Sequence, residues 1–308
     1  MNTLKMRWTS VVWSVVYLLL LLSLLSPFSI VTVFFLILPA AILFTTLNVK
    51  SFILHVLPVW LIAYLVHPVY LLLAVYFMIP ALIMGRAYKR RVPAIRTLML
   101  GAGTILAELL LLLLVGTAFF HFDLSSYVHD IVKMTMSPLR DVGGSNPLIS
   151  DMAWSPEEMQ MVSDATVQMI PFAMIVSSFM MAVITHALAR PIMDSMGFSV
   201  PRLKPAREWM LPRSLIWYYL IGVIIEIFAS GSKNSFLDMI AANLLPLLHI
   251  CFMIQAFGFF FFLGHKRKWH PVIPLLFAIP ILLFPPMRII GILDLAFPLR
   301  QFMTKSKR

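Results

Sequence analysis

A basic segment with the sequence Arg202-Leu-Lys-Pro-Ala-Arg-Glu-Trp-Met-Leu-Pro-Arg213 leads into two long apolar runs joined by the polar turn Ser230-Gly-Ser-Lys-Asn-Ser235. Each run approaches the roughly 20 apolar residues that a helix needs to cross a bilayer core of about 30 Å. Polar side chains inside such runs are rare, because lipid offers them no partners. The runs therefore predict membrane helices that carry candidate solute-binding residues, namely Glu226, Asn243, His249 and Gln255.

The whole chain has the same apolar character. Its 308 residues are 61% hydrophobic and 12% charged, with a mean hydropathy of +0.93, whereas a soluble domain has roughly 25% charged residues. Backbone polar groups in lipid must be satisfied within the structure, and the alternation of about ten residues per strand that marks a membrane β-barrel is absent. The composition predicts an all-α, polytopic transmembrane bundle that forms a single integral membrane domain over residues 1–308.

Apolar segments divide the chain into candidate spans. They lie at about residues 10–26, 29–47, 51–66, 68–84, 97–120, 166–190, 214–230, 237–263 and 271–287. The last segment ends at Pro285-Pro286, and because proline breaks a helix the chain either crosses a final time or turns back as a re-entrant hairpin. We therefore predict eight to nine segments.

Basic residues predict the orientation of the chain. The net charge is +11, and Lys and Arg gather at the N-terminus and in alternate loops, which fits the positive-inside rule with a cytoplasmic N-terminus. The short clusters argue for a multi-pass protein of the bacterial cytoplasmic membrane and against nucleic-acid binding. Cytoplasmic basic clusters also dock protein partners or anionic lipid. The candidate docking residues are Arg86, Lys89, Arg90, Arg91, Arg202 and Arg207.

Residues 121–164 form an extracytoplasmic loop with seven acidic and two basic residues. The apolar positions between Val128 and Met136 recur at helical spacing, which predicts an amphipathic helix on the membrane surface that ends at Gly143-Gly144. The sequence Ser155-Pro-Glu-Glu158 is typical of a capping box. A second helix is expected to start there and to run without interruption into the segment at 166–190. The loop is either a lid or a plain connector.

Two parts of the chain resemble the YybS family of predicted bacterial membrane proteins. The first runs from Leu38-Pro39 to Gly85-Arg86 and ends in the pattern Gly-Arg-x-x-Lys-Arg-Arg. The second is carried by Trp209-Met-Leu-Pro212, Trp217, Asn243, Gln255-Ala-Phe-Gly258, Gly291-Ile-Leu-Asp294, Phe297 and Arg300.

The resemblance implies a transporter-like role. The family has no assigned activity, but its helical layout is similar to the S components of energy-coupling-factor transporters, which have fewer helices. That similarity implies capture of a small solute, with cytoplasmic surfaces that dock a coupling protein or ATPase module. The alternative is a membrane scaffold or regulatory protein that recruits a partner through its basic loops.

Individual polar residues sharpen these expectations. Glu108 lies at the middle of its segment, where a carboxyl group either binds a cation or an amine, carries a proton, or rests protonated against a neighbouring helix. Asn243, His249 and Gln255 are six residues apart, so they cannot share one helix face. We place Asn243 with Glu226 near a pocket.

The sequence gives no sign of an enzyme. It lacks a phosphate loop and an HExxH motif, and its single cysteine, Cys251, lies in an apolar run. His121, Asp123, His129 and Asp130 have metal-capable side chains, but their spacing matches no metal site. We therefore expect no catalysis, no cofactor and no metal.

Overall fold

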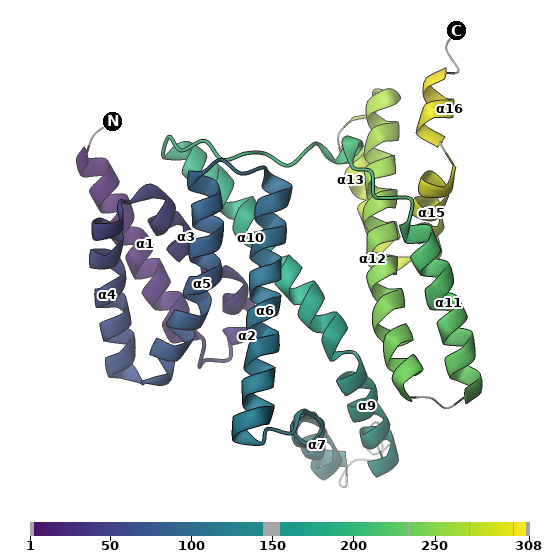
Figure 1. The fold of residues 1–308 in the computed structure, drawn as a ribbon, viewed down its shortest axis with the longest axis horizontal. Coiled ribbons are helices and arrows are strands. Elements are labelled where there is room, and N and C mark those ends of the chain that lie inside the picture. Colours follow the sequence, from purple (N-terminus) through teal and green to yellow (C-terminus); the bar gives the residue numbers. More distant parts are fainter. Residues whose placement is uncertain (1–2, 144–154, 233–234, 271, 298, 306–308) are drawn as a thin grey trace. The chain divides into compact units, whose positions relative to one another are not determined.

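Figure 1 shows the fold in a computed structural model, which describes residues 3–143, 155–232, 235–270, 272–297 and 299–305. These residues form helices and connections and no β-strand, which confirms the all-α prediction. The chain folds as two compact units. The first joins Met1–Phe122 with Met174–Leu203, and the second joins Asp123–Ala173 with Lys204–Arg308.

Six helical stretches of the described residues are long and apolar enough to cross a membrane. They are Ser29–Thr46, Val49–Val66, Val69–Lys89, Ala94–Phe120, Ile170–Ser195 and Phe236–Lys266, and a bent helix pair near the C-terminus raises the number to seven. Trp8–Ser23 and Leu215–Ser230 are apolar but shorter. At 1.5 Å per residue such a helix spans roughly 24 Å, less than the bilayer core. The predicted eight to nine crossings and their orientation stay predictions.

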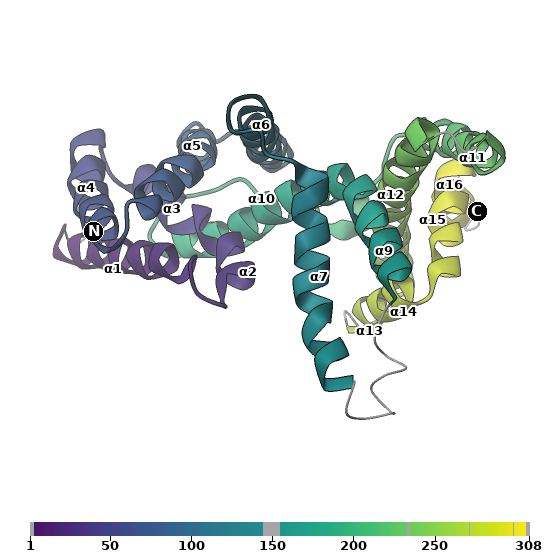
Figure 2. The ribbon, with the colours of Figure 1, turned by 90° about the horizontal axis from the view of Figure 1, so that it is seen from below.

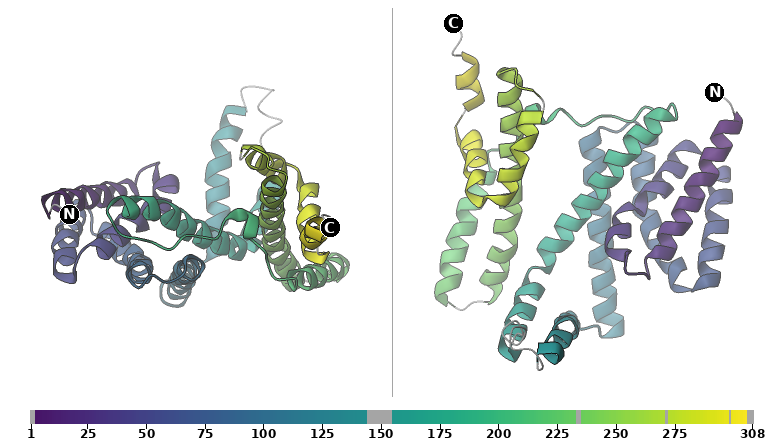
Figure 3. Two further views of the ribbon diagram at one scale, coloured as in Figure 1. Left: turned by 90° about the horizontal axis from the view of Figure 1, so that it is seen from above. Right: turned by 180° about the vertical axis from the view of Figure 1, so that it is seen from behind.

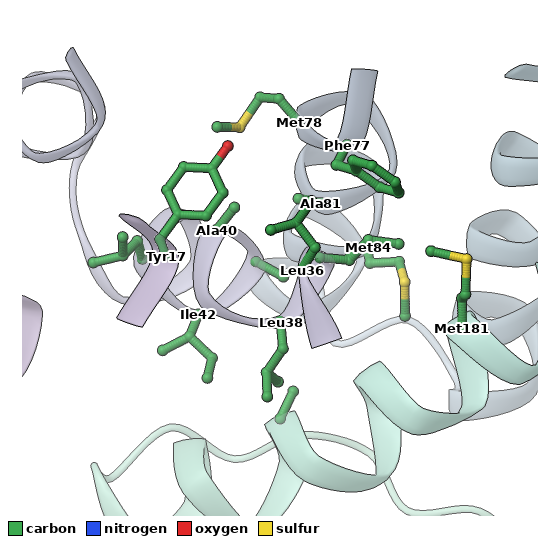
Figure 4. Close-up of a cluster of buried hydrophobic side chains, with 14 of the residues drawn as sticks. Tyr17, Leu36, Leu38, Ala40, Ile42, Phe77, Met78, Ala81, Met84 and Met181 are labelled. Atoms are coloured by element: carbon green, nitrogen blue, oxygen red, sulfur yellow. The ribbon is translucent and has the colours of Figure 1, made fainter. Parts of the chain in front are cut away.

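The first unit packs around a short, almost wholly buried helix, α3 (Ile37–Thr46). It also contains α1 (Thr3–Ser23), α2 (Ser29–Thr32), η1 (Val33–Phe35), α4 (Val49–Val66), α5 (Val69–Lys89), α6 (Ala94–Phe120) and most of α10 (Ile170–Ser195). Figure 4 shows part of the core, in which side chains of α3, Met84 of α5 and Met181 of α10 belong to one hydrophobic cluster. Tyr17 reaches in from α1, and its hydroxyl donates to the Ala74 carbonyl at 3.3 Å.

Glycines allow the helices of this unit to pack closely. A Cβ at Gly85 would meet Phe44 and the Ala41 carbonyl of α3, and a Cβ at Gly101 would meet Met84 and Ala182. Small residues at such contacts are typical of membrane helix packing, where van der Waals contact replaces the hydrophobic effect. α5, α6 and α10 therefore form one tight layer around Gly101.

The second unit is built on the longest helix, α12 (Ser235–Lys266). It also contains α7 (Leu124–Gly143), α9 (Pro156–Gln168), η2 (Ala206–Glu208), α11 (Leu215–Ser232), α13 (Val272–Leu276), α14 (Ala278–Leu283), η3 (Pro285–Met287), α15 (Arg288–Ala296) and α16 (Leu299–Lys305). Figure 3 shows α11, α15 and α16 beside α12. A Cβ at Gly222 of α11 would meet Leu245 of α12, so this glycine sets the close spacing of the hairpin.

The predicted amphipathic helix is α7, which lies beside α9 in Figure 2. Its apolar and polar residues separate onto two faces. Val128 is buried, whereas Ile131 and Met134 are exposed. The predicted capping box is present, because Ser155 N–H donates to Glu158 at 2.7 Å and Glu158 N–H donates to the Ser155 hydroxyl at 3.2 Å. Gly144 lies outside the described residues, and α7 ends at Gly143.

We expect the start of α7 to be pH-sensitive. The Ser126 hydroxyl and the N–H groups of Ser126 and Ser125 donate to Asp123 and hold the pKa of its carboxyl below the usual value. A depressed folded pKa contributes stability above the unfolded pKa of about 3.9, which is lost as the pH falls through the folded pKa. Amide-exchange protection of the first turn should be flat at neutral pH and decline below about pH 4. Asp123→Ala should remove this amide-exchange protection at neutral pH. Asp130→Ala, a change within the helix, should leave the protection in place.

The expected continuous helix from Ser155 into 166–190 is wrong, because α9 ends at Gln168 and α10 begins at Ile170. Pro171 explains the break. Its nitrogen carries no hydrogen and its ring clashes with the preceding turn, so the ladder of helical hydrogen bonds cannot pass through it. The freed backbone groups need other partners.

The C-terminal segments turn back beside α12. The helix pair Val272–Leu283 and Pro285–Ala296 is bent by 119°. Along α12, Pro274 contacts Gly264, Ile281 packs with Ala256 and Phe260, Gly291 lies against Phe252, and Arg300 lies over the Phe262 ring. These contacts run along α12 from Gly264 to Phe252 and then return to Phe262. The chain thus turns back along α12 and brings Arg300 to the end of α12 that carries Lys266. Whether the bent pair crosses the membrane or re-enters stays a prediction.

Candidate solute pocket

A cavity of about 580 Å³ lies within the second unit, between the end of α9, the outer half of α11, the first half of α12 and the start of α15. Its volume is within the range of small-molecule sites. Its polar and charged lining residues are Gln168, Tyr219, Glu226, Ser230, Asp238, His249 and Arg288. Glu226 and His249, two of the predicted site residues, therefore face the same cavity.

Charges of both signs line this cavity without neutralising one another directly. His249 lies within electrostatic range of both Arg288 and Glu226. Among the described residues, the side chains of Arg288 and Glu226 form no ion pair and no hydrogen bond. Tyr219 packs against His249 with ring centroids 5.7 Å apart and holds the imidazole on the wall. The cavity therefore presents charged groups of both signs that form no ion pair with each other.

Pro246 leaves a further hydrogen-bond acceptor, the Ala242 carbonyl, without its helical donor. It lies inside α12, and because proline has no N–H the Ala242 carbonyl loses its helical donor. Both residues line the cavity. A backbone carbonyl at this depth is able to accept a hydrogen bond from a solute, as the unwound carbonyls of membrane transporters do.

Asn243 does not line the cavity. Its side chain instead forms hydrogen bonds with backbone groups at the break between α9 and α10. Its Oδ1 accepts from Phe172 N–H at 2.6 Å, and its Nδ2 donates to the Gln168 carbonyl at 2.7 Å. In an unbroken helix those two backbone groups would bond to each other, four residues apart. The carboxamide is inserted between them, so Asn243 fixes the bend that places Gln168 at the cavity.

Gln255 lies elsewhere on α12, in a buried polar network. Its Nε2 donates to Asp294 Oδ2 at 2.6 Å, and its Oε1 accepts from Leu211 N–H at 2.9 Å. Arg300 donates to the same carboxylate, with Nη2 2.7 Å from Oδ2, and also to the Arg207 carbonyl at 3.0 Å. Asp294 and Gln255 are fully buried. The network ties the C-terminal helices to the segment that precedes α11.

Glu108 belongs to the first unit and is not among the residues that line this cavity. The basic residues proposed for docking do not line it either, and five of the six are exposed: Arg86, Lys89, Arg90, Arg91 and Arg202. Lys89 donates to the Leu47 carbonyl at 3.0 Å and lies over the Phe44 ring. Arg207 is partly buried, and its Nη1 lies 3.2 Å from His265 Nδ1. In the described part of the chain, no group of three His, Cys, Asp or Glu side chains is placed to hold a metal ion.

A family model described as a predicted membrane protein (DUF2232) matches residues 14–295. The chain belongs to the DUF2232 family. A relative with the printed name "Uncharacterized protein YybS", from Bacillus subtilis (strain 168), is 29% identical over 136 residues. That alignment covers 43% of this chain and 44% of the relative, less than half its length. The resemblance to the YybS family is confirmed.

No solved structure matches the chain. The likeness of the DUF2232 family to transporter S components stays a prediction. The motif residues in the second part of the YybS resemblance nevertheless share one structural role. They lie at contacts between α12 and the segments that flank it, and they are Gln255, Gly258, Gly291, Asp294 and Arg300.

Sequence reasoning missed three charged or aromatic residues of the cavity, Tyr219, Asp238 and Arg288. Asp238 lies in the first turn of α12. Arg288 was the most informative of the three. It follows Pro285-Pro286, and the bend at these prolines brings it back beside α12.

Proposed function

We propose that this membrane protein of the DUF2232 family captures a small polar solute in the cavity between α9, α11, α12 and α15. The observation that carries the proposal is the convergence of carboxylate, guanidinium, imidazole and phenol side chains around one open cavity of about 580 Å³. A packed membrane core has no need of such groups, whereas solute sites near the bilayer middle are built from them.

Solute capture accounts for the irregular helices around the cavity. The break at Met169, Pro246 within α12 and the bend at Pro285 each place backbone or side-chain polar groups on its wall. Discontinuous helices of this kind line the binding sites of membrane transporters. The mechanism proposed is binding and release without covalent chemistry, in the bacterial cytoplasmic membrane, with a small solute as the ligand.

A coupling protein or ATPase module completes the transporter-like proposal. The chain has no phosphate-loop motif, so uptake driven by ATP would need another subunit. The exposed basic residues Arg86, Lys89, Arg90 and Arg91 cluster around the end of α5. They offer a charged surface for such a subunit.

Purification of the full chain from its membrane in mild detergent tests the proposal directly. Mass spectrometry is expected to recover a defined small molecule that is retained by the wild type. Arg288→Ala and Glu226→Gln should each lower its affinity by about 10- to 100-fold, because each removes a charged hydrogen-bonding group worth about 1.5–3 kcal/mol.

Matched controls separate a site effect from a general loss of charge. Arg267→Ala and Glu157→Gln make the same changes at exposed positions of the second unit, and both should retain the molecule. Solute capture would be contradicted if the wild type carried no small molecule and instead retained a stoichiometric protein partner. Loss of that partner on charge reversal at Arg90 and Arg91 would favour the scaffold alternative.

A further inference from the structure

The first unit contains a buried carboxyl group that no hydrogen bond explains. Glu108 lies near the middle of α6 and is 9% exposed. Both of its carboxyl oxygens are buried, and neither has a hydrogen-bond partner among the described residues. An isolated ionised carboxylate in apolar surroundings costs several kcal/mol or more. The site is therefore incomplete without a positive charge.

The neighbouring helix supplies a second unpartnered group. The hydroxyl of Tyr76, on α5, is also buried and without a partner among the described residues. Glu108 acts on Tyr76 electrostatically. The two helices run antiparallel with Met84 against Gly101, so moving about two turns along each of them from that contact leads to Tyr76 and Glu108. The phenol and the carboxyl thus face one small region between α5 and α6.

The sequence of α6 directs Glu108 inward. The buried residues of α6 are Ala94, Thr97, Leu98, Gly101, Ala102, Ile105 and Glu108. Their spacing of three and four residues makes one helix face, and the glutamate ends it. The side chain accordingly occupies a core position that an apolar residue would fill if packing were its only role.

The charged and titratable groups of α10 that lie in this unit are distant from the pair. They include His186 and Arg190, and His186 Nδ1 lies 3.3 Å from the hydroxyl of Tyr88. Tyr88 is twelve residues beyond Tyr76 on α5, which is roughly 18 Å along the helix. Neither His186 nor Arg190 is therefore placed to neutralise Glu108.

We propose that Glu108 and Tyr76 form a binding site for a monovalent cation, either H⁺ or Na⁺. One carboxylate and one hydroxyl give hard oxygen ligands and a single negative charge, which a monovalent cation balances. A proton bound to the carboxyl gives the same compensation. The site lies in a different unit from the solute cavity.

Labelling with dicyclohexylcarbodiimide, a lipid-soluble reagent for protonated carboxyl groups, tests this site in the purified full chain. Peptide mass spectrometry is expected to find Glu108 modified at acidic pH. Labelling of a proton site should fall about tenfold per pH unit once the carboxyl ionises. For a sodium site, replacing choline chloride with sodium chloride should protect Glu108 at constant pH, and potassium chloride should not.

Two variants keep the test decisive. Glu108→Gln retains the size of the side chain without the charge, and its thermal midpoint should no longer respond to pH or sodium as that of the wild type does. Tyr76→Phe should remain labelled but shift the pH or sodium concentration at which labelling is lost. Labelling of Glu108 that is independent of pH and sodium would overturn the proposal. An unlabelled Glu108, with equal responses of the midpoint in wild type and Glu108→Gln, would also overturn it.

Discussion

Replacing Asp294 by asparagine is expected to lower the free energy of unfolding by about 3–5 kcal/mol, the usual cost of breaking a buried ion pair. Asp294 is fully buried, and the Arg300 side chain that it holds is only 13% exposed. The substitution preserves the size of the side chain, but it removes the Asp294 negative charge from the Arg300 guanidinium. Thermal unfolding of the purified protein, followed by the loss of monodisperse material, measures the effect.

A double variant identifies the cause of this loss. Arg300→Met in the Asp294→Asn background also removes the guanidinium charge, so part of the stability should return, since a buried charge that has lost its ion pair with Asp294 is the main cost. The matched control is Asp194→Asn, which breaks the partly exposed pair between Arg190 and Asp194. There we expect about 0.3–0.5 kcal/mol, as for other helix pairs four residues apart. Equal losses at Asp294 and Asp194 would contradict the role of the buried network.

Helix positions and local caps were predictable from the sequence because both are set by neighbours in the chain. Apolar runs located the helices, and Ser155 with Glu158 located the start of α9. The break at Met169 was missed even though Pro171 is visible in the sequence. Its stabilising partner, Asn243, is 71 residues away from Phe172, and local patterns do not reveal such a pairing.

The candidate site was predictable only in part for the same reason. Glu226 and His249 stand out as polar residues in apolar runs, and both line the cavity. Gln255 looks equivalent in the sequence, yet its helical rotation directs it to Asp294. Arg288 reaches the cavity only because the chain turns back beside α12. The direction of each side chain depends on tertiary packing, which periodicity within one helix does not specify.

Gly291→Ala is expected to be the most disruptive single substitution of a small residue in the second unit. A Cβ at Gly291 would overlap the carbonyl of Phe252 and crowd the backbone nitrogen of Ala256. These are backbone atoms of α12, so no side-chain rotation relieves the contact and α15 must move away. Overpacking costs typically 1–3 kcal/mol, and a backbone contact should place this variant at or above about 3 kcal/mol.

The displacement of α15 should also affect function, because α15 carries both Arg288 of the cavity and Asp294 of the buried network. Gly291→Ala should therefore lower the thermal midpoint and abolish retention of the small molecule together. Gly103→Ala is the matched control, since a Cβ there meets no atom within 4 Å, and alanine favours a helix over glycine by about 1 kcal/mol. If Gly291→Ala behaved like Gly103→Ala in both measurements, α15 would not be packed against α12 as the turn back along α12 requires.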